Sequence, residues 1–257
     1  MTQAHAGVRT SPEAARDRLI VALDVPRVTE AIAIAEELGD IVSFYKIGPH
    51  LLLDPELHSL FRRLKSGGKN VFLDCKLFDI PATVAGAVRA AANLGVKFIT
   101  VAGQQPIIRA AVKAKHGSSL QILVVTLLTY MDQNDLQREY QNNVSLEDFI
   151  LARAKFAAEN GCDGVISSAR EVRLIRESIN QENFMIVTPG IRPRGSELND
   201  QKRVVTPYEA IANGSDYLVI GRPIIDAPSR RRAAEEILSQ IRMAIEETVA
   251  SGPRTYA

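Results

Sequence analysis

Eight short apolar runs, separated by longer amphipathic segments, are the feature that most limits how this chain can fold. The runs are rich in β-branched residues and are bounded by turn residues, which is typical of buried strands. Several intervening segments have the apolar spacing of helices and end in Gly, which tolerates the left-handed conformation found after many helices. The eight runs are 19–25, 42–48, 71–77, 96–103, 120–128, 164–169, 184–191 and 216–223.

Strands that alternate with helices are expected to be parallel, because a crossover helix returns the chain to the same edge of the sheet. Eight such units in 257 residues predict an α/β fold, a single closed (β/α)₈ TIM barrel. The alternative is an open doubly wound sheet, which usually carries a Gly-rich fingerprint after its first strand, and none follows 19–25. We expect residues 1–17 to be an N-terminal extension or capping segment and residues 18–257 to form the catalytic barrel.

The overall charge and the cysteine content exclude several classes of protein. The formal net charge is +1, so the chain lacks the basic field expected for binding nucleic acid or an anionic membrane. Cys75 and Cys162 are the only cysteines, and their separation fits neither a metal site nor a redox motif. Residues 1–18 have no apolar signal core, and no run approaches the roughly 20 apolar residues of a membrane span. We therefore predict a soluble, cytoplasmic protein.

Charged residues occur where the first three strands are expected to end. Asp24 ends the first, Lys46 the second, and Asp74 and Lys76 the third. Residues two apart in a strand share a face, so Asp74 and Lys76 point the same way and Cys75 points toward the helices. Because barrel enzymes carry their chemistry at the carboxyl ends of the strands, the four charged side chains are predicted to form one cluster there.

Each of these residues also has a structural alternative. Asp24 is compatible with a helix cap, Lys46 with a side chain that extends to solvent, and Asp74 with Lys76 with a structural ion pair. Asp79 lies just before a predicted helix, where a carboxylate is favoured by the helix dipole. The pattern alone leaves these alternatives open.

No metal or common nucleophile motif is apparent. The chain has no G-x-S-x-G elbow and no Walker A loop, which argues against a serine hydrolase and an NTPase. The four histidines show no metal-ligand spacing, and we predict surface or interhelix roles for His5, His50, His58 and His116.

The segments after the seventh and eighth strands lie where barrels commonly bind phosphate. Gly221 allows the backbone to approach a ligand closely, and Arg222 offers a guanidinium fork to phosphate oxygens. Two long polar stretches, 129–145 and 192–206, follow the fifth and seventh strands. Loops of this length in a compact domain are often functional lids, so we expect these stretches to cover the site.

Taken together, these motifs resemble the orotidine 5'-phosphate decarboxylase family in its bacterial form. The most specific match is "LDCKLFDIPATV", which is similar to the family's D-x-K-x-x-D-I-P-x-T signature. It is supported by "LDV", "FYKIG", "VTLLT", "VTPGIRP" and "IGRP", in order along the chain. The resemblance implies a homodimeric barrel that converts orotidine 5'-monophosphate to uridine 5'-monophosphate and CO₂ in pyrimidine biosynthesis, without metal or organic cofactor.

The resemblance also implies roles for the signature residues. Lys76 would protonate C6 of the pyrimidine as the carboxylate leaves, and Asp74 and Asp79 would flank it. Asp79, Ile80 and Thr83 would reach into the active site of the partner subunit. The two active sites of the dimer would then be shared.

The remaining expected contacts also follow from the resemblance. Asp24 and Lys46 would hold the ribose hydroxyls, and Lys46 would continue the charge network. Thr129 is preferred over Thr126 as the contact to the pyrimidine. The other expected contacts are Pro189 to the pyrimidine and Arg192, Gln201, Gly221 and Arg222 to the phosphate.

Two other functions remain open. A magnesium-dependent sugar phosphate enzyme, such as a keto-acid sugar phosphate decarboxylase or a hexulose phosphate synthase, has a similar D-x-K-x-x-D strand. Such enzymes place an acidic metal ligand near the end of the second strand, where this chain has Lys46, which favours the metal-free reaction. A non-catalytic nucleotide-binding barrel is disfavoured because Lys76 and both of its carboxylates are present.

Overall fold

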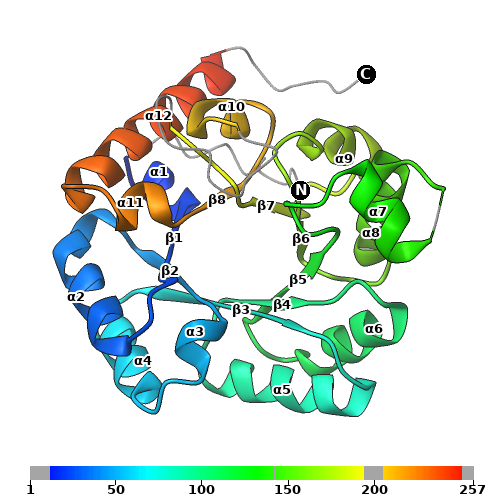
Figure 1. Cartoon of the computed structure of the whole chain (residues 1–257), viewed down its shortest axis with the longest axis horizontal. Helices are drawn as coiled ribbons and strands as arrows, with labels where there is room; N and C mark the ends of the chain where they lie inside the picture. Colours follow the sequence, from blue (N-terminus) through cyan, green and yellow to red (C-terminus); the bar gives the residue numbers. More distant parts are fainter. Residues whose placement is uncertain (1–11, 142, 194–204, 251–257) are drawn as a thin grey trace, which may run out of the picture.

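A computed structural model describes residues 12–141, 143–193 and 205–250. Over these residues eight parallel strands pair in chain order, and β8 pairs with β1 to close the barrel (Figure 1). The predicted TIM barrel is therefore confirmed. The strands are β1 (Leu19–Ala22), β2 (Phe44–Ile47), β3 (Asn70–Leu77), β4 (Phe98–Val101), β5 (Gln121–Val125), β6 (Gly164–Ile166), β7 (Met185–Thr188) and β8 (Tyr217–Ile220).

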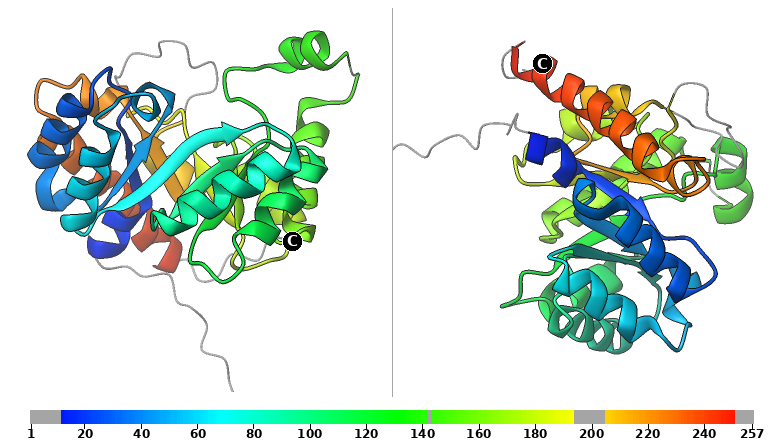
Figure 2. Two further views of the ribbon diagram at one scale, coloured as in Figure 1. Left: turned by 90° about the horizontal axis from the view of Figure 1, so that it is seen from below. Right: turned by 90° about the vertical axis from the view of Figure 1, so that its left-hand side faces the viewer.

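Helices surround the barrel and cover its outer face, as Figures 1 and 2 show. The helices that follow strands and pack on the barrel are α2 (Val28–Leu38), α4 (Leu57–Ser66), α5 (Pro81–Asn93), α6 (Gln105–Ala114), α8 (Leu146–Glu159), α9 (Val172–Ser178), α10 (Pro207–Ala212) and α12 (Arg230–Ala250). The additional short elements are α1 (Pro12–Arg18), η1 (Gly39–Ile41), α3 (Pro49–Leu52), α7 (Gln133–Tyr140) and α11 (Arg222–Ile225). Helix α1 packs against α12 beside the barrel.

The alternation of side chains along each strand builds two cores. Outward residues pack under the helices, and inward residues such as Ile20, Leu123 and Val187 fill the barrel. Alternation also determines where polar residues lie, because a strand that points an apolar residue inward points the residue two positions later inward as well. Phe44 is thus followed by Lys46, and Phe72 by Asp74.

Aromatic rings close the amino-terminal end of the barrel interior. Phe44, Phe98 and Tyr217 begin their strands and pack together with ring centroids 5.0 to 6.0 Å apart; Tyr217 meets both phenylalanines edge to face, and the two phenylalanine rings are tilted to each other. The Lys97 ammonium lies 5.1 Å from the centroid of the Phe44 ring, on the same cluster. Phe72 packs against Phe98 one layer higher. The open end of the barrel is therefore the carboxyl-terminal end.

The polar stretch 129–145, predicted as a loop, contains a helix. Helix α7 begins at a capping box in which Asp132 accepts from the backbone of Asp135 and Asp135 accepts from the backbone of Asp132. Figure 2 shows α7 standing away from the barrel on the side of the strand carboxyl ends. Most of the second polar stretch, 194–204, lies outside the described residues. None of the described helices is long and apolar enough to cross a membrane.

Candidate active site

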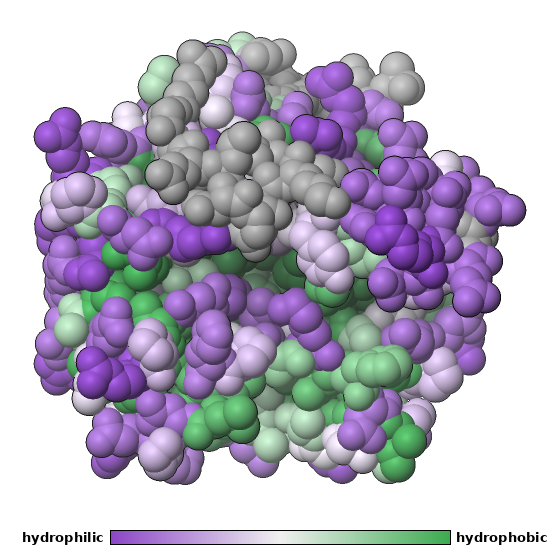
Figure 3. Space-filling view, viewed as in Figure 1, coloured by the Kyte–Doolittle hydropathy of each residue, from purple (hydrophilic) through white to green (hydrophobic). Residues whose placement is uncertain are grey.

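A cavity of about 570 Å³ opens at the carboxyl ends of the strands. Figure 3 looks onto this face and shows the molecule hollowed near its centre. The volume is in the range of small-molecule sites. Phe72, Val125 and Val219 provide apolar lining. The predicted site residues that line the cavity are Asp24, Lys46, Asp74, Lys76, Thr129, Pro189, Arg192, Gly221 and Arg222.

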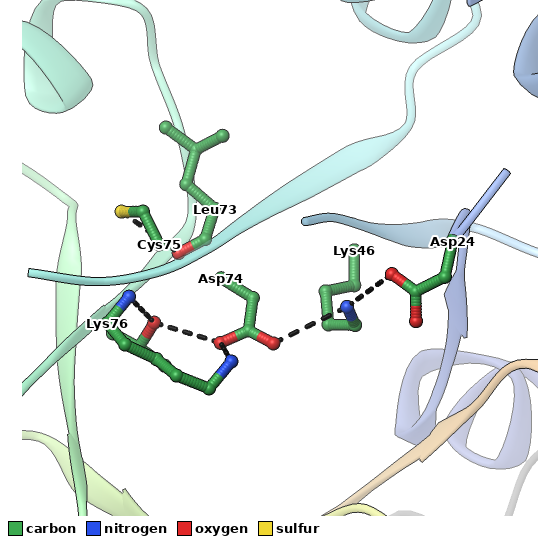
Figure 4. Close-up of polar contacts among 7 residues, drawn as sticks. Asp24, Lys46, Leu73, Asp74, Cys75 and Lys76 are labelled. Carbon is green, nitrogen blue, oxygen red and sulfur yellow. Dashed lines mark hydrogen bonds and ion pairs between the residues drawn. The ribbon is translucent and has the colours of Figure 1, made fainter. Parts of the chain in front are cut away.

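Four charged side chains from three neighbouring strands form a continuous chain of contacts across the cavity (Figure 4). The Lys46 ammonium donates to Asp24 Oδ1 at 2.8 Å and lies 3.4 Å from Asp74 Oδ2. The Lys76 ammonium donates to Asp74 Oδ1 at 2.9 Å. Positive and negative groups therefore alternate in the order Asp24, Lys46, Asp74, Lys76, and the predicted cluster is present.

The contacts of Asp24 and Lys46 do not fit the purely structural roles that the sequence left open, a helix cap for Asp24 and a solvent-directed side chain for Lys46. Helix α2 is preceded by Arg27 and has no side-chain cap, so Asp24 does not cap it. Lys46 does not extend to solvent, because only 7% of its surface is exposed. Both residues use their charged groups inside the cavity.

Asp74 is held as a carboxylate at the centre of the cluster. Burial alone would raise its pKa, but the charges of Lys46 and Lys76 and the hydrogen bonds from Lys76 and Thr100 outweigh burial and lower the pKa. The side chain is 15% exposed, so these contacts are little screened by water. Asp74 therefore keeps a fixed negative charge between two ammonium groups.

The backbone of Lys76 adopts a left-handed conformation, with φ of +45°, which is uncommon for a residue other than Gly. The pairing of β3 with β4 shifts register between Leu73 and Leu77 at this point. Figure 4 shows Cys75 on the side of the strand opposite Asp74 and Lys76, as predicted. Burial raises the pKa of the Cys75 thiol to about 11, which keeps the thiol in its protonated, weakly nucleophilic form near neutral pH.

Thr100, which was not among the predicted site residues, holds this irregular segment in place. The Lys76 amide donates to Thr100 Oγ1 at 2.9 Å, and Thr100 Oγ1 donates to Asp74 Oδ1 at 3.0 Å. Thr100 is fully buried. The alternation of side chains along β4 could have identified Thr100 as an inward-facing residue, because Phe98 points into the barrel and the residue two positions later then does the same.

Replacing Thr100 by valine should lower kcat/KM about tenfold, because the isosteric side chain leaves the Lys76 amide and an Asp74 oxygen without this partner, at a cost of about 1–3 kcal/mol. Thr100→Ser keeps the hydroxyl and should retain most of the activity. Steady-state kinetics of the two variants check this, and equal loss in both would contradict the role of the hydroxyl.

Gly48 allows the Asp24 and Lys46 groups to approach each other. A Cβ at this position would lie 2.9 Å from Asp24 Oδ1 and 3.2 Å from Lys46 Nζ, closer than side-chain atoms normally come. A Cβ on Gly221, at the end of β8, would lie 3.9 Å from the other carboxylate oxygen, Asp24 Oδ2. Two glycines therefore leave the Asp24 carboxylate accessible from the cavity.

Thr129 and Thr126 occupy different positions at the end of β5. Thr129 lines the cavity. Thr126 is fully buried, and its hydroxyl donates to the carbonyl of Ile166 at 2.9 Å. The geometry thus favours Thr129 over Thr126 for contact with a ligand.

Two of the described arginines line the cavity, Arg192 after β7 and Arg222 after β8. Arg192 is buried, and one of its Nη1 hydrogens is donated to the carbonyl of Ile191. Arg222 is exposed and begins α11 at the rim. Gln201, predicted to accompany them, lies outside the described residues.

Three residues predicted for the site do not line the cavity of their own chain. Asp79, Ile80 and Thr83 are exposed at the start of α5. Ile80 is 66% exposed and its neighbour Phe78 is 71% exposed, which is unusual for large apolar side chains. These residues form an apolar and acidic projection outside the cavity.

His50 and Asp226 line the cavity although neither was predicted as a site residue. The short helix α3 brings His50 to the rim. His50 is exposed, as predicted, but its place beside the cavity depended on a four-residue helix that gives no periodic signal. Among the described residues no cluster of three or more His, Cys, Asp or Glu side chains is arranged to hold a metal ion.

Comparison with known proteins identifies relatives over most of the chain. The model of the orotidine 5'-phosphate decarboxylase / HUMPS family matches residues 17–237. The orotidine 5'-phosphate decarboxylase of Ruegeria pomeroyi is 47% identical over 227 residues, 88% of this chain and 95% of the relative. That of Methylococcus capsulatus is 48% identical, covering 88% and 92%. The crystal structure of orotidine 5'-phosphate decarboxylase from Lactobacillus acidophilus superposes with a TM-score of 0.74 at 34% identity, covering 87% and 98%.

Proposed function

Because this chain belongs to the orotidine 5'-phosphate decarboxylase / HUMPS family, we propose that it decarboxylates orotidine 5'-monophosphate to uridine 5'-monophosphate and CO₂. The observation that carries the proposal is the chain of contacts among Asp24, Lys46, Asp74 and Lys76 within the cavity. It places one ammonium, that of Lys76, at the end of a fixed array of charges.

The chemistry of the substrate explains the need for this array. Loss of CO₂ leaves an electron pair at C6 of the pyrimidine, with no adjacent carbonyl to accept it. An ammonium held at C6 stabilises that charge and then delivers its proton, so that a C–H bond replaces the C–C bond that breaks. Lys76 fits this role because Asp74 and the Thr100-bound backbone fix its position before the reaction begins.

The rest of the substrate would be bound away from C6. Asp24 and Lys46 offer an acceptor and a donor to the ribose hydroxyls, and Arg222, at the rim, offers a guanidinium to the phosphate. Binding energy gained at the phosphate orients the ring, although the phosphate takes no part in the bond changes. Thr129 and Pro189, which also line the cavity, would contact the pyrimidine.

The position of Lys46 supports a reaction without a metal ion. Its ammonium lies between the Asp24 and Asp74 carboxylates and uses an oxygen of each. A divalent cation bound to the same oxygens would have to displace this buried ammonium. The magnesium-dependent sugar phosphate enzymes are therefore a poorer match to this arrangement.

The test is to follow the ultraviolet absorbance of orotidine 5'-monophosphate with purified protein and a metal chelator. Loss of the substrate absorbance with formation of uridine 5'-monophosphate supports the proposal. Absence of the reaction with and without added Mg²⁺ would overturn it. Activity that requires Mg²⁺ would instead support a metal-dependent member of the family.

We further propose that the protein is a homodimer with shared active sites. Asp79, Ile80 and Thr83 belong to the signature segment but lie outside the cavity of their own chain, next to the exposed ring of Phe78. A second subunit docked here would bury this apolar surface and bring the Asp79 carboxylate toward a cavity that its own chain does not complete.

Mixing Lys76→Ala subunits with Asp79→Ala subunits should restore activity that neither variant has alone, since each heterodimer then contains one site with both residues. Random mixing at equal concentrations makes half of the dimers heterodimers, so we expect about a quarter of the wild-type sites to return. Refolding the variants separately before mixing is the control. No recovery in co-refolded samples would show that Asp79 acts within its own chain.

A further inference from the structure

Arg153, on the barrel-facing side of α8, contacts three segments that are distant in sequence. Its guanidinium donates to the carbonyl of Thr126 at 2.8 Å, at the end of β5. Its carbon Cζ lies 5.4 Å from the ring centroid of Tyr140 and 4.3 Å from that of Phe149. Its side chain also packs on Gly103, where a Cβ would lie 3.2 Å from Arg153 Cδ. None of these contacts is explained by the chemistry described above.

The contact with Thr126 bears directly on the wall of the cavity. The amide and the hydroxyl of Thr126 both donate to the carbonyl of Ile166, and its own carbonyl accepts from Arg153. Thr126 is thus fixed from β6 on one side and from α8 on the other. The next three residues, Leu127, Leu128 and Thr129, line the cavity.

The contact with Tyr140 bears on α7. Tyr140 is the last residue of α7, and its ring packs at 5.1 Å on the ring of Phe149 in α8. The Arg153 guanidinium lies against both rings, and arginine stacks well on aromatic faces because its charged group is planar. The start of α7 is held separately, since the Gln133 side chain bonds the backbone of Val144 and Leu146.

We propose that Arg153 is a positioning residue that sets the segment 127–129 against the substrate and couples it to α7. The inference rests on the proposed function, because it assumes that Thr129 contacts the pyrimidine. Arg153 itself does not line the cavity, so it acts through the Thr126 carbonyl and the ring of Tyr140. Without the guanidinium, α7 and the end of β5 lose their common partner.

Arg109, on α6, provides a control, since it makes the same kinds of contact with the C-terminal end of α8. Its Cζ lies 5.8 Å from the ring centroid of Phe156, and its Nε donates to Asn160 Oδ1 at 3.2 Å. None of these three residues lines the cavity. Loss of Arg109 therefore reports the cost of removing an arginine that packs on α8 from α6, without disturbing the cavity wall.

The experiment compares Arg153→Met, Arg153→Lys and Arg109→Met with wild type, using orotidine 5'-monophosphate kinetics and thermal unfolding. We expect kcat/KM of Arg153→Met to fall by about 10- to 100-fold, because small misplacements of a contact group have effects of this size. The loss should include kcat. Arg153→Lys should recover part of it through a hydrogen bond to Thr126, and Arg109→Met should keep full kcat/KM.

Two outcomes would overturn the inference. One is unchanged kcat/KM in Arg153→Met, and the other is a loss that follows the drop in melting temperature equally in Arg153→Met and Arg109→Met. An inactive wild type would instead overturn the proposed function. If Arg153→Met does not fold, amide exchange of Arg153→Lys serves in its place: faster exchange at Met131, whose amide donates to the Leu128 carbonyl, supports the inference, and exchange equal to wild type refutes it.

Discussion

Replacing Lys76 by alanine is expected to reduce kcat/KM by at least about 10⁴-fold, because a general acid and a fixed positive charge are lost together. The side chain reaches the cavity from the end of β3, and its ammonium bonds Asp74. No other described residue on β3 offers an ammonium to take its place. Decarboxylation of orotidine 5'-monophosphate, measured at saturating and at low substrate concentration, checks this expectation.

Binding of the product distinguishes loss of chemistry from loss of folding. Lys76→Ala should still bind uridine 5'-monophosphate, since Asp24, Lys46 and Arg222 remain. Lys115→Ala removes a lysine that pairs with Asp163 away from the cavity, and it should retain full turnover. Turnover of Lys76→Ala within tenfold of wild type would contradict the assigned role of the ammonium.

Replacing Asp74 by asparagine is expected to reduce kcat/KM by at least about 10³-fold and to destabilise the fold by about 3 kcal/mol. Asparagine keeps the shape but removes the charge between the two ammonium groups of Lys46 and Lys76. These groups would then repel each other across a mostly buried site. Enzyme kinetics and denaturant unfolding of the same preparation measure both effects.

The stability difference should also depend on pH in a defined direction. The Asp74 pKa in the folded protein is below its ordinary value near 3.8, so the carboxylate stabilises the fold fully above that pH. This contribution is lost as pH falls from 3.8 through the lower folded-state pKa. The gap in unfolding free energy between wild type and Asp74→Asn should therefore be constant near neutral pH and shrink only in acid.

Asp163→Asn is a matched control for this variant. The Asp163 carboxylate accepts from Lys115 and from the amide of Ile122, but it does not line the cavity. Its loss should destabilise the protein without changing kcat/KM. If Asp74→Asn behaved in the same way, the carboxylate would be structural only.

Much of the site could be predicted because strand periodicity determines which side chains face inward. In β2 and β3, alternation alone places Lys46, Asp74 and Lys76 on one face, and parallel pairing brings them within contact distance. The left-handed backbone of Lys76 could not be predicted, because it depends on a hydrogen bond to Thr100 from another strand. Tertiary contacts of this kind leave no mark in local sequence.

Elements without a strong apolar period were also missed. Helix α7 has a single buried residue, Leu136, so its sequence resembles a loop, although Asp132 and Asp135 were available as a helix-start signal. His50 reached the rim on a helix of only four residues. The predicted role of Gln201 remains a prediction, since it lies outside the described residues.

The aromatic layer at the base of the barrel limits where molecules can enter and leave the cavity. The buried rings of Phe44 and Phe98 pack against each other at that end, so the cavity above Phe72 opens at the carboxyl-terminal end of the barrel. Under the proposed function, substrate would enter, and both CO₂ and the nucleotide product would leave, past the same rim where His50 and Arg222 lie. A segment that covered this rim would therefore control both entry and departure.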